Sequence, residues 1–215
     1  MIVIHLLYDL TEAYSLLPPM GASYYAVKNY GSIVFFLISG ICATLGHRHI
    51  KRGALVLGCG MLVSLVTALW GLPVRFGVLH CLGSSMILWN LFKAASFRAL
   101  FLGAAGSLAF GRIFADYTVS SPLLYPLALT AAGFESADFF PLFPYFGFFL
   151  LGALFGRIFY ARRRSLLRNL HFSGHFSRFF CFCGRHSLLL YLIHQPLLIF
   201  FIETAIFIGG SFHEI

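Results

Sequence analysis

Ionisable side chains interrupt stretches of this chain that are otherwise apolar. The clearest case is the segment Gly184-Arg185-His186-Ser187 through Tyr191-Leu192-Ile193-His194-Gln195-Pro196, which begins an apolar run that continues to Gly209. If the run is helical, His194 lies about 12 Å beyond His186, at 1.5 Å per residue. An imidazole at that depth costs free energy unless it faces protein or a water-filled cavity, so it marks a functional site by default. We expect His194 to line a pocket and Pro196 to kink the helix there.

His5 and Asp9 are spaced i, i+4 and share one face of a helix. A carboxylate beside an imidazole fixes the ring's tautomer and stabilises the imidazolium that forms when the ring accepts a proton. Such a pair can act as a general base toward an amine or a hydroxyl. It can equally be a polar pair at a helix end, with Asp9 at the water interface, and the spacing leaves both interpretations open.

Other polar groups have an ordinary structural explanation beside a functional one. His80 lies a few residues into an apolar segment and can bind a substrate or hydrogen-bond a neighbouring carbonyl. Ser39-Gly40 is a small-residue step that lets helices approach closely. Arg48, Arg52 and Arg185 set topology and contact lipid headgroups, or converge on a phosphate, which arginine binds in bidentate fashion.

The composition indicates that the lipid bilayer is the solvent of this chain. Of its 215 residues 60% are hydrophobic and 10% are charged, whereas soluble domains carry about 25% charged residues. The net charge of +8 comes from basic residues in short loops between apolar segments, which is typical of topology signals and argues against nucleic acid as a partner. Cys181-Phe182-Cys183 has no second cysteine pair, so we expect no metal.

The apolar segments predict an all-α, polytopic bundle with about seven crossings, in a single domain over residues 1–215. The predicted spans are residues 1–10 (a half-span), 31–46, 54–72, 76–92, 97–114, 140–160 and 184–208. The loop 115–139 holds a second apolar patch, Leu127 to Phe134, that is too short to span. We expect a short interfacial helix there.

Lysine and arginine are retained on the cytoplasmic side of a membrane, and this rule orients the chain. Basic residues crowd the loops after the second, fourth and sixth predicted spans, whereas the opposite loops carry most of the acidic residues. We therefore expect a cytoplasmic N-terminus and an extracytoplasmic C-terminus. The compact length and the lack of a sorting segment favour a bacterial inner membrane.

Taken together, these segments resemble one known family. Phe76-Gly77-Val78-Leu79-His80 is similar to a segment of bacterial membrane proteins that carry the heparan-α-glucosaminide N-acetyltransferase catalytic domain. Asp138 to Pro144, Phe146 to Gly152 and Gly184 to Pro196 resemble later parts of the same family, and Phe35 to Gly40 with Arg52-Gly53 resembles its second span and basic loop. The order and spacing of the segments carry the resemblance over nearly the whole chain.

The resemblance implies a membrane acyltransferase that moves an acyl group, with acetyl expected, from cytoplasmic acyl-CoA to an amine or hydroxyl of an extracytoplasmic sugar or glycan. It places His5 as the general base with Asp9 orienting it, and His80, Asp138 and His194 on the acceptor side. The residues expected to bind the acetyl-CoA co-substrate are Ser39, Arg48, Arg52, Arg185 and His186. The family's first span also carries an arginine eleven residues before this histidine, which would precede Met1, so we expect the first span to be incomplete here.

Two other functions stay open at this stage. A small-solute transporter or channel would use His80 and His194 to line a permeation path without covalent chemistry. A catalytically degenerate relative would act only as a membrane partner of other proteins. The expected partners are a sugar acceptor, membrane lipids and, as a further possibility, a second copy of the chain.

Overall fold

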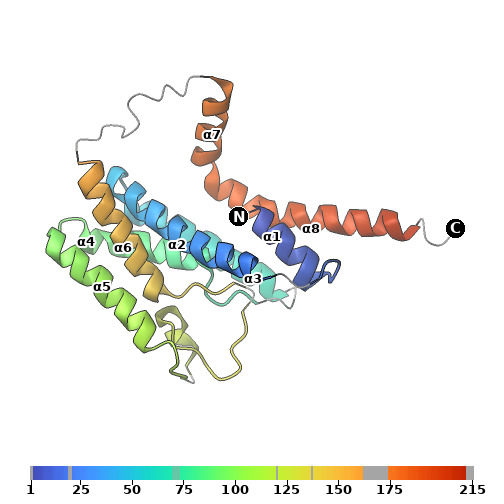
Figure 1. Cartoon of the computed structure of the whole chain (residues 1–215), viewed down its shortest axis with the longest axis horizontal. Coiled ribbons are helices and arrows are strands. Elements are labelled where there is room, and N and C mark those ends of the chain that lie inside the picture. Colours follow the sequence, from blue (N-terminus) through green and yellow to red (C-terminus); the bar gives the residue numbers. More distant parts are fainter. Residues whose placement is uncertain are drawn as a thin grey trace. The chain divides into compact units, whose positions relative to one another are not determined.

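The computed structural model describes residues 2–18, 21–69, 71, 73–119, 121–136, 138–161 and 174–211. The prediction of an all-α fold is confirmed: 77% of the structure is helical and the described residues form no β-strand (Figure 1). The elements are α1 (Ile2–Tyr8), the π-helical turn η1 (Asp9–Ala13), α2 (Ala22–Leu45), α3 (His49–Leu69), α4 (Val78–Phe92), α5 (Phe97–Ile113), the 3-10 helix η2 (Pro122–Leu127), α6 (Leu142–Phe159), α7 (His175–Arg185) and α8 (Ser187–Ser211).

Four helices in the described part are long and apolar enough to cross a membrane, and seven crossings are not confirmed. The four segments are Tyr24–Leu45, His49–Leu69, Leu142–Phe159 and Ser187–Ile208. Helices α4 and α5 have 15 and 17 residues, which at 1.5 Å per residue gives about 22 and 26 Å, short of a hydrocarbon core of about 30 Å.

Three predicted boundaries differ from the structure. Helix α2 begins at Ala22, well before the predicted residue 31, because its first turns carry polar residues that the hydropathy pattern excluded. Residues 175–183 lie between the predicted spans 140–160 and 184–208, but they form most of α7, which ends at Arg185. The short helix predicted in the loop 115–139 is present as η2, but it precedes most of the apolar patch and ends where Ala128 adopts a left-handed conformation (φ 71°). Its interfacial position stays a prediction.

The chain forms two compact units. Unit 1 comprises Met1–Tyr30 and Asn169–Ile215, and unit 2 comprises Gly31–Arg168. The prediction of one domain over residues 1–215 is not tested by this division.

Unit 2 is held together by helices that approach each other at glycine. A side chain at Gly40 of α2 would overlap the backbone of Phe149 in α6, and one at Gly152 of α6 would overlap the backbone of Leu37. Gly53 of α3 and Gly83 of α4 approach each other in the same way. The close helix approach predicted for Gly40 is therefore confirmed. Such contacts gain van der Waals packing, which drives helix association in lipid.

Prolines shape the start of α6. Pro141 is the residue before the helix, Phe143 has non-helical angles (φ −103°, ψ 125°), and the Phe143–Pro144 peptide bond is cis. The Pro144 ring packs against Gly111 at the end of α5. This contact fixes the beginning of α6 against α5.

Unit 1 consists of α1, η1, the first turns of α2, α7 and α8. Helix α8 continues without interruption through Pro196. The Tyr24 hydroxyl donates to the carbonyl of Ile4 at 3.4 Å, and the Lys28 ammonium lies 5.7 Å from the centre of the Tyr8 ring. Helix α1 lies against α8, which brings the two ends of the chain together in one unit.

Candidate functional site

Two histidines meet where α1 packs against α8. His5 is half-buried and His194 is only 8% exposed. The centres of their rings are 4.9 Å apart, with the ring planes at 64°, so one edge points at the other face. The structure therefore brings together the expected general base and a residue expected on the acceptor side, which are far apart in the sequence.

The hydrogen bonding of His194 leaves one ring nitrogen without a partner. Its Nδ1 lies 2.5 Å from the carbonyl oxygen of Tyr191, and because a carbonyl can only accept, Nδ1 is the donor. Its Nε2 is buried and has no hydrogen-bond partner among the described residues. In the neutral ring Nε2 then carries the lone pair, which is the form that accepts a proton. The geometry thus prepares His194 to bind or deprotonate a donor group.

Asp9 is connected to α8 through Gln195. Asp9 is 4% exposed. Both of its carboxylate oxygens accept from Nε2 of Gln195 at 2.9 Å. This amide also leaves its Oε1 buried and unbonded within the described structure. Because Gln195 follows His194 directly, the Asp9–Gln195 contact fixes the part of α8 that carries His194. That Asp9 orients His5 stays a prediction.

A second polar contact joins η1 to α8 beyond Gln195. The Tyr14 hydroxyl donates to the carboxylate of Glu203 at 2.7 Å. This hydrogen bond raises the pKa of Tyr14 to about 12, since ionising the phenol would remove the donor and set two negative charges side by side. Local sequence patterns predicted neither this contact nor the role of Gln195. The sequence does contain an indication for Gln195 and Glu203, since both are polar residues inside an apolar run and such residues mark candidate sites.

In unit 2, His80 is engaged at the start of α4. His80 is 3% exposed, and its Nδ1 accepts from the backbone N–H of Gly77 at 3.2 Å. Its Nε2 lies 3.4 Å from the hydroxyl of Ser64, which donates to the carbonyl of Val74. Both ring nitrogens thus lie within hydrogen-bonding distance of neighbouring groups, and these contacts cap the amino end of α4. A substrate contact for His80 stays a prediction.

Asp138 also binds the first turn of α4. Its Oδ2 accepts from the backbone N–H of Val78 at 3.0 Å, where a carboxylate satisfies an unpaired donor and complements the helix dipole. Phe140 N–H donates to the carbonyl of Phe76 at 2.8 Å, and the Ser136 hydroxyl donates to the Asp138 carbonyl. These bonds join the loop before α6 to α4. Binding of an acceptor by Asp138 stays a prediction.

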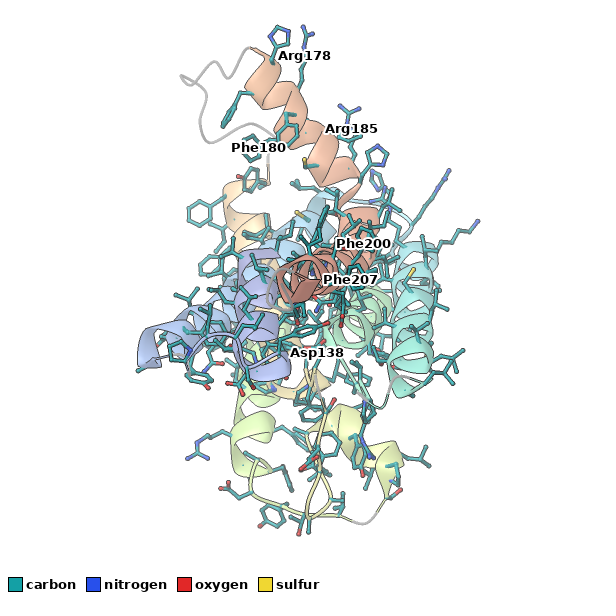
Figure 2. All side chains as sticks on the ribbon, turned by 90° about the vertical axis from the view of Figure 1, so that its right-hand side faces the viewer. Asp138, Arg178, Phe180, Arg185, Phe200 and Phe207 are labelled. Atoms are coloured by element: carbon teal, nitrogen blue, oxygen red, sulfur yellow. The ribbon has the colours of Figure 1, made fainter. Side chains whose placement is uncertain are left out.

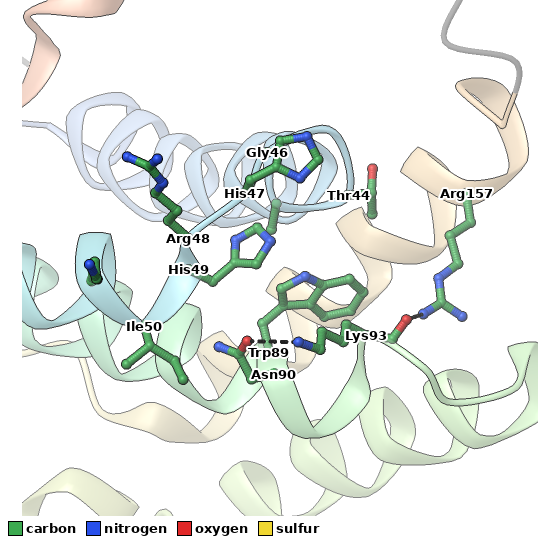
Figure 3. Close-up of a pocket in the computed structure, with 12 residues that line it drawn as sticks. Thr44, Gly46, His47, Arg48, His49, Ile50, Trp89, Asn90, Lys93 and Arg157 are labelled. Carbon is green, nitrogen blue, oxygen red and sulfur yellow. Dashed lines mark hydrogen bonds between the residues drawn. The ribbon is translucent and has the colours of Figure 1, made fainter.

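A basic cavity of about 510 Å³ opens in unit 2 between the α2–α3 turn, the end of α4 and α6 (Figure 3). Its polar lining residues are Thr44, His47, Arg48, His49, Lys51, Asn90, Lys93 and Arg157. No carboxylate lines it within the described structure. An anion therefore finds several donors and no like charge among these lining residues.

Of the residues expected to bind acetyl-CoA, only Arg48 lines this cavity. Ser39 donates to the carbonyl of Phe35 in its own helix at 2.8 Å. Arg52 is exposed on the next turn of α3. Arg185 and His186 are exposed in unit 1, at the junction of α7 and α8. A role for these four in cofactor binding stays a prediction.

Arg157 of α6 fixes the α4 side of the cavity and was missed as a site residue. Its guanidinium donates to the backbone carbonyls of Phe92, Lys93 and Ala95, at 3.1, 2.7 and 2.5 Å. It also lies 5.5 Å from the centre of the Trp89 ring, a cation–π contact. Arg157 thus holds the carboxyl end of α4, from which Lys93 reaches Asn90 Oδ1 at 3.4 Å. The sequence around Arg157 does not indicate this role, because the hydrogen bonds join elements more than 60 residues apart.

One comparison with known proteins identifies the type of domain. The family model described as "Heparan-alpha-glucosaminide N-acetyltransferase, catalytic" matches residues 1–196. No curated protein and no solved structure matches the chain. The described residues contain no group of three or more His, Cys, Asp or Glu side chains that could hold a metal ion.

Proposed function

The chain belongs to the heparan-alpha-glucosaminide N-acetyltransferase catalytic family, and on this premise we propose that it transfers an acetyl group from acetyl-CoA to an amine or hydroxyl of a sugar. The family is one of membrane acetyltransferases that use acetyl-CoA and a sugar acceptor. With its apolar helices, this makes the chain an integral membrane protein. We also propose that the membrane is the bacterial inner membrane and that the N-terminus is cytoplasmic. The acetyl group is then delivered to a sugar on the far side of the membrane.

The observation that carries the proposal is the His5–His194 pair, with its buried and unbonded Nε2 on His194. In the proposed step an imidazole takes the proton from the acceptor amine or hydroxyl as that atom attacks the thioester carbonyl. The new C–N or C–O bond forms, the C–S bond breaks, and the CoA thiolate leaves and takes up the proton. General-base catalysis of this kind contributes about 10²- to 10⁴-fold. His5 acts as the base, and His194 beside it holds the acceptor.

Asp9 and Gln195 support this pair by position. The two hydrogen bonds from Gln195 to Asp9 join η1, directly after the helix of His5, to the residue after His194. Replacing Asp9 by Ala leaves a buried amide without its acceptor, which costs about 1–3 kcal/mol. We expect the loss to appear in kcat more than in KM for acetyl-CoA, because the ring geometry changes while the basic cavity does not.

The basic cavity of unit 2 is the proposed site for the phosphates of CoA. Arg48, Lys51 and Lys93 supply cations around it, and the two histidines of the α2–α3 turn supply further donors. Nucleotide phosphates carry several negative charges, so an anion is favoured where cations converge without a carboxylate. Raising the ionic strength should therefore raise KM for acetyl-CoA.

To test the proposal, the full chain is reconstituted in proteoliposomes. Labelled acetyl-CoA is supplied on one side of the membrane, and amino sugars or neutral sugars are supplied on either side. Labelled acetyl-sugar that depends on the chain supports the proposal. Sugar or ion flux without consumption of acetyl-CoA would show a transporter instead. Binding of neither substrate, with stable folding, would show a degenerate membrane partner.

A further inference from the structure

Helix α7 separates its side chains into an aromatic and a basic face. Positions spaced i, i+3, i+4 and i+7 lie on one side of a helix. By this spacing one face carries Phe176, Phe179, Phe180 and Cys183, and the other carries Arg178, Cys181 and Arg185. Figure 2 shows Phe180 and Arg185 projecting from opposite sides of the helix. The helix contains no acidic residue.

In unit 1, the described residues leave the aromatic face of α7 uncovered. No residue of α7 is buried. The side chains of Phe176, Phe179 and Phe180 are between 58% and 75% exposed. Two of the rings contact each other, since the centres of Phe176 and Phe180 are 4.8 Å apart. Contiguous exposed aromatic surface marks a surface that binds a partner or a membrane.

The connection of α7 to α8 indicates which of these covers the face. The apolar segment of α8 that can span a membrane begins at Ser187, and only His186 separates it from α7. The end of a spanning segment lies at the boundary between hydrocarbon and headgroups, so the carboxyl end of α7 lies within a few ångström of that boundary. With 11 residues, or about 16 Å, α7 is too short to cross a core of about 30 Å. A helix so placed, with aromatic residues on one face and arginine on the other, lies in the interface.

We propose that α7 is an interfacial helix that binds anionic lipid. Its phenylalanine face enters the acyl boundary, and Arg178 and Arg185 contact negatively charged headgroups. The charges fit this ligand, since both ionised groups of the helix are positive and each basic residue near an anionic surface adds to binding. The chain would thereby anchor the amino end of α8 at a fixed depth. The proposal does not depend on the acetyltransferase reaction.

Two cysteines of α7 provide a test, because Cys181 is on the basic face and Cys183 on the aromatic face. Cys181→Ser and Cys183→Ser variants are reconstituted in lipid nanodiscs and treated with a charged maleimide, and the double variant gives the background from Cys42, Cys59 and Cys81. We expect Cys181 to react at least about tenfold faster than Cys183, the factor that corresponds to 1.4 kcal/mol of protection. In SDS the two should react at equal rates. Equal rates in nanodiscs would overturn the proposal.

The lipid charge and a protein partner are tested separately. Protection of Cys183 should be stronger in discs with phosphatidylglycerol than in discs of phosphatidylcholine alone, and Arg178→Gln should remove this difference. No difference between the two lipids would overturn the preference for anionic lipid. Discs that hold one copy of the chain should protect Cys183 as well as discs that hold two. Protection that requires two copies would assign the face to a second copy of the chain and overturn the proposal.

Discussion

Replacing Arg157 tests whether the carboxyl end of α4 and the basic cavity depend on one guanidinium. Arg157 donates to three backbone carbonyls after Trp89, and it complements the negative end of the α4 dipole. Arg157→Met keeps the length of the side chain but leaves those carbonyls without a donor. Arg157→Lys keeps the charge but cannot supply the planar fork that reaches several carbonyls at once.

The magnitude follows from the hydrogen bonds. A bond to a charged group contributes about 1.5–3 kcal/mol when buried. Arg157 is half-buried, and water can reach the exposed hydrogen bond to Lys93, so that bond is left out of the sum. We count about 1.5 kcal/mol for each of the bonds to Phe92 and Ala95, and therefore expect Arg157→Met to lose about 3 kcal/mol of stability. For a chain of this length that lowers the midpoint of thermal unfolding by roughly 6–12 °C. Arg157→Lys should lose about half as much, and both variants should raise KM for acetyl-CoA.

The control is Arg112→Gln. Arg112 is 83% exposed and lies 3.9 Å from Asp116, which follows the end of α5, a surface pair worth about 0–1 kcal/mol. Its midpoint should fall by less than roughly 4 °C and its KM should not change. The assays are thermal unfolding in nanodiscs and initial rates at varied acetyl-CoA. An Arg157→Met variant that unfolds no lower than Arg112→Gln would refute the reasoning.

Three further predictions follow from unit 2. Gly40→Val should abolish folding or lower the yield of monodisperse protein severalfold in size-exclusion chromatography, because the new side chain would overlap the backbone of α6. The control is Gly58→Val, which should behave as the original chain because the space around Gly58 is open. Asp138→Ala should cost about 0.5–2 kcal/mol of stability in thermal unfolding through loss of the cap on α4, and an unchanged midpoint would contradict that cap. Arg48→Gln combined with Lys93→Gln should raise KM for acetyl-CoA more than it lowers kcat, and an unchanged KM would place the phosphates elsewhere.

The fold could be predicted where hydropathy determines it. Helices α3 to α6 and α8 lie close to the predicted spans, because long apolar stretches in lipid must satisfy their backbone groups within a helix. Helix α7 was missed since its phenylalanines and arginines alternate at helical spacing and give no continuous apolar run. The prediction of about seven crossings is not confirmed, because apolar composition does not measure helix length, as the 15 residues of α4 show.

The sequence predicted several residues of the candidate site, but it did not predict the contacts between them. The sequence indicated His5 and His194 separately, since each is polar within an apolar stretch. Their contact, and the hydrogen bonds from Gln195 to Asp9, join positions almost the full chain apart, which no local spacing encodes. The basic cavity collects side chains from the α2–α3 turn with its flanking helix ends, from the end of α4 and from α6, so single segments indicated only Arg48.

The most direct test of the central claim is the turnover of His194→Ala beside that of His5→Ala, with labelled acetyl-CoA and an amino sugar under saturating conditions. The His5–His194 pair predicts that kcat falls by about 10²- to 10⁴-fold in His5→Ala, and severely in His194→Ala, with unfolding midpoints close to that of the original chain. Undiminished kcat in either variant would contradict the assignment of this pair as the catalytic centre.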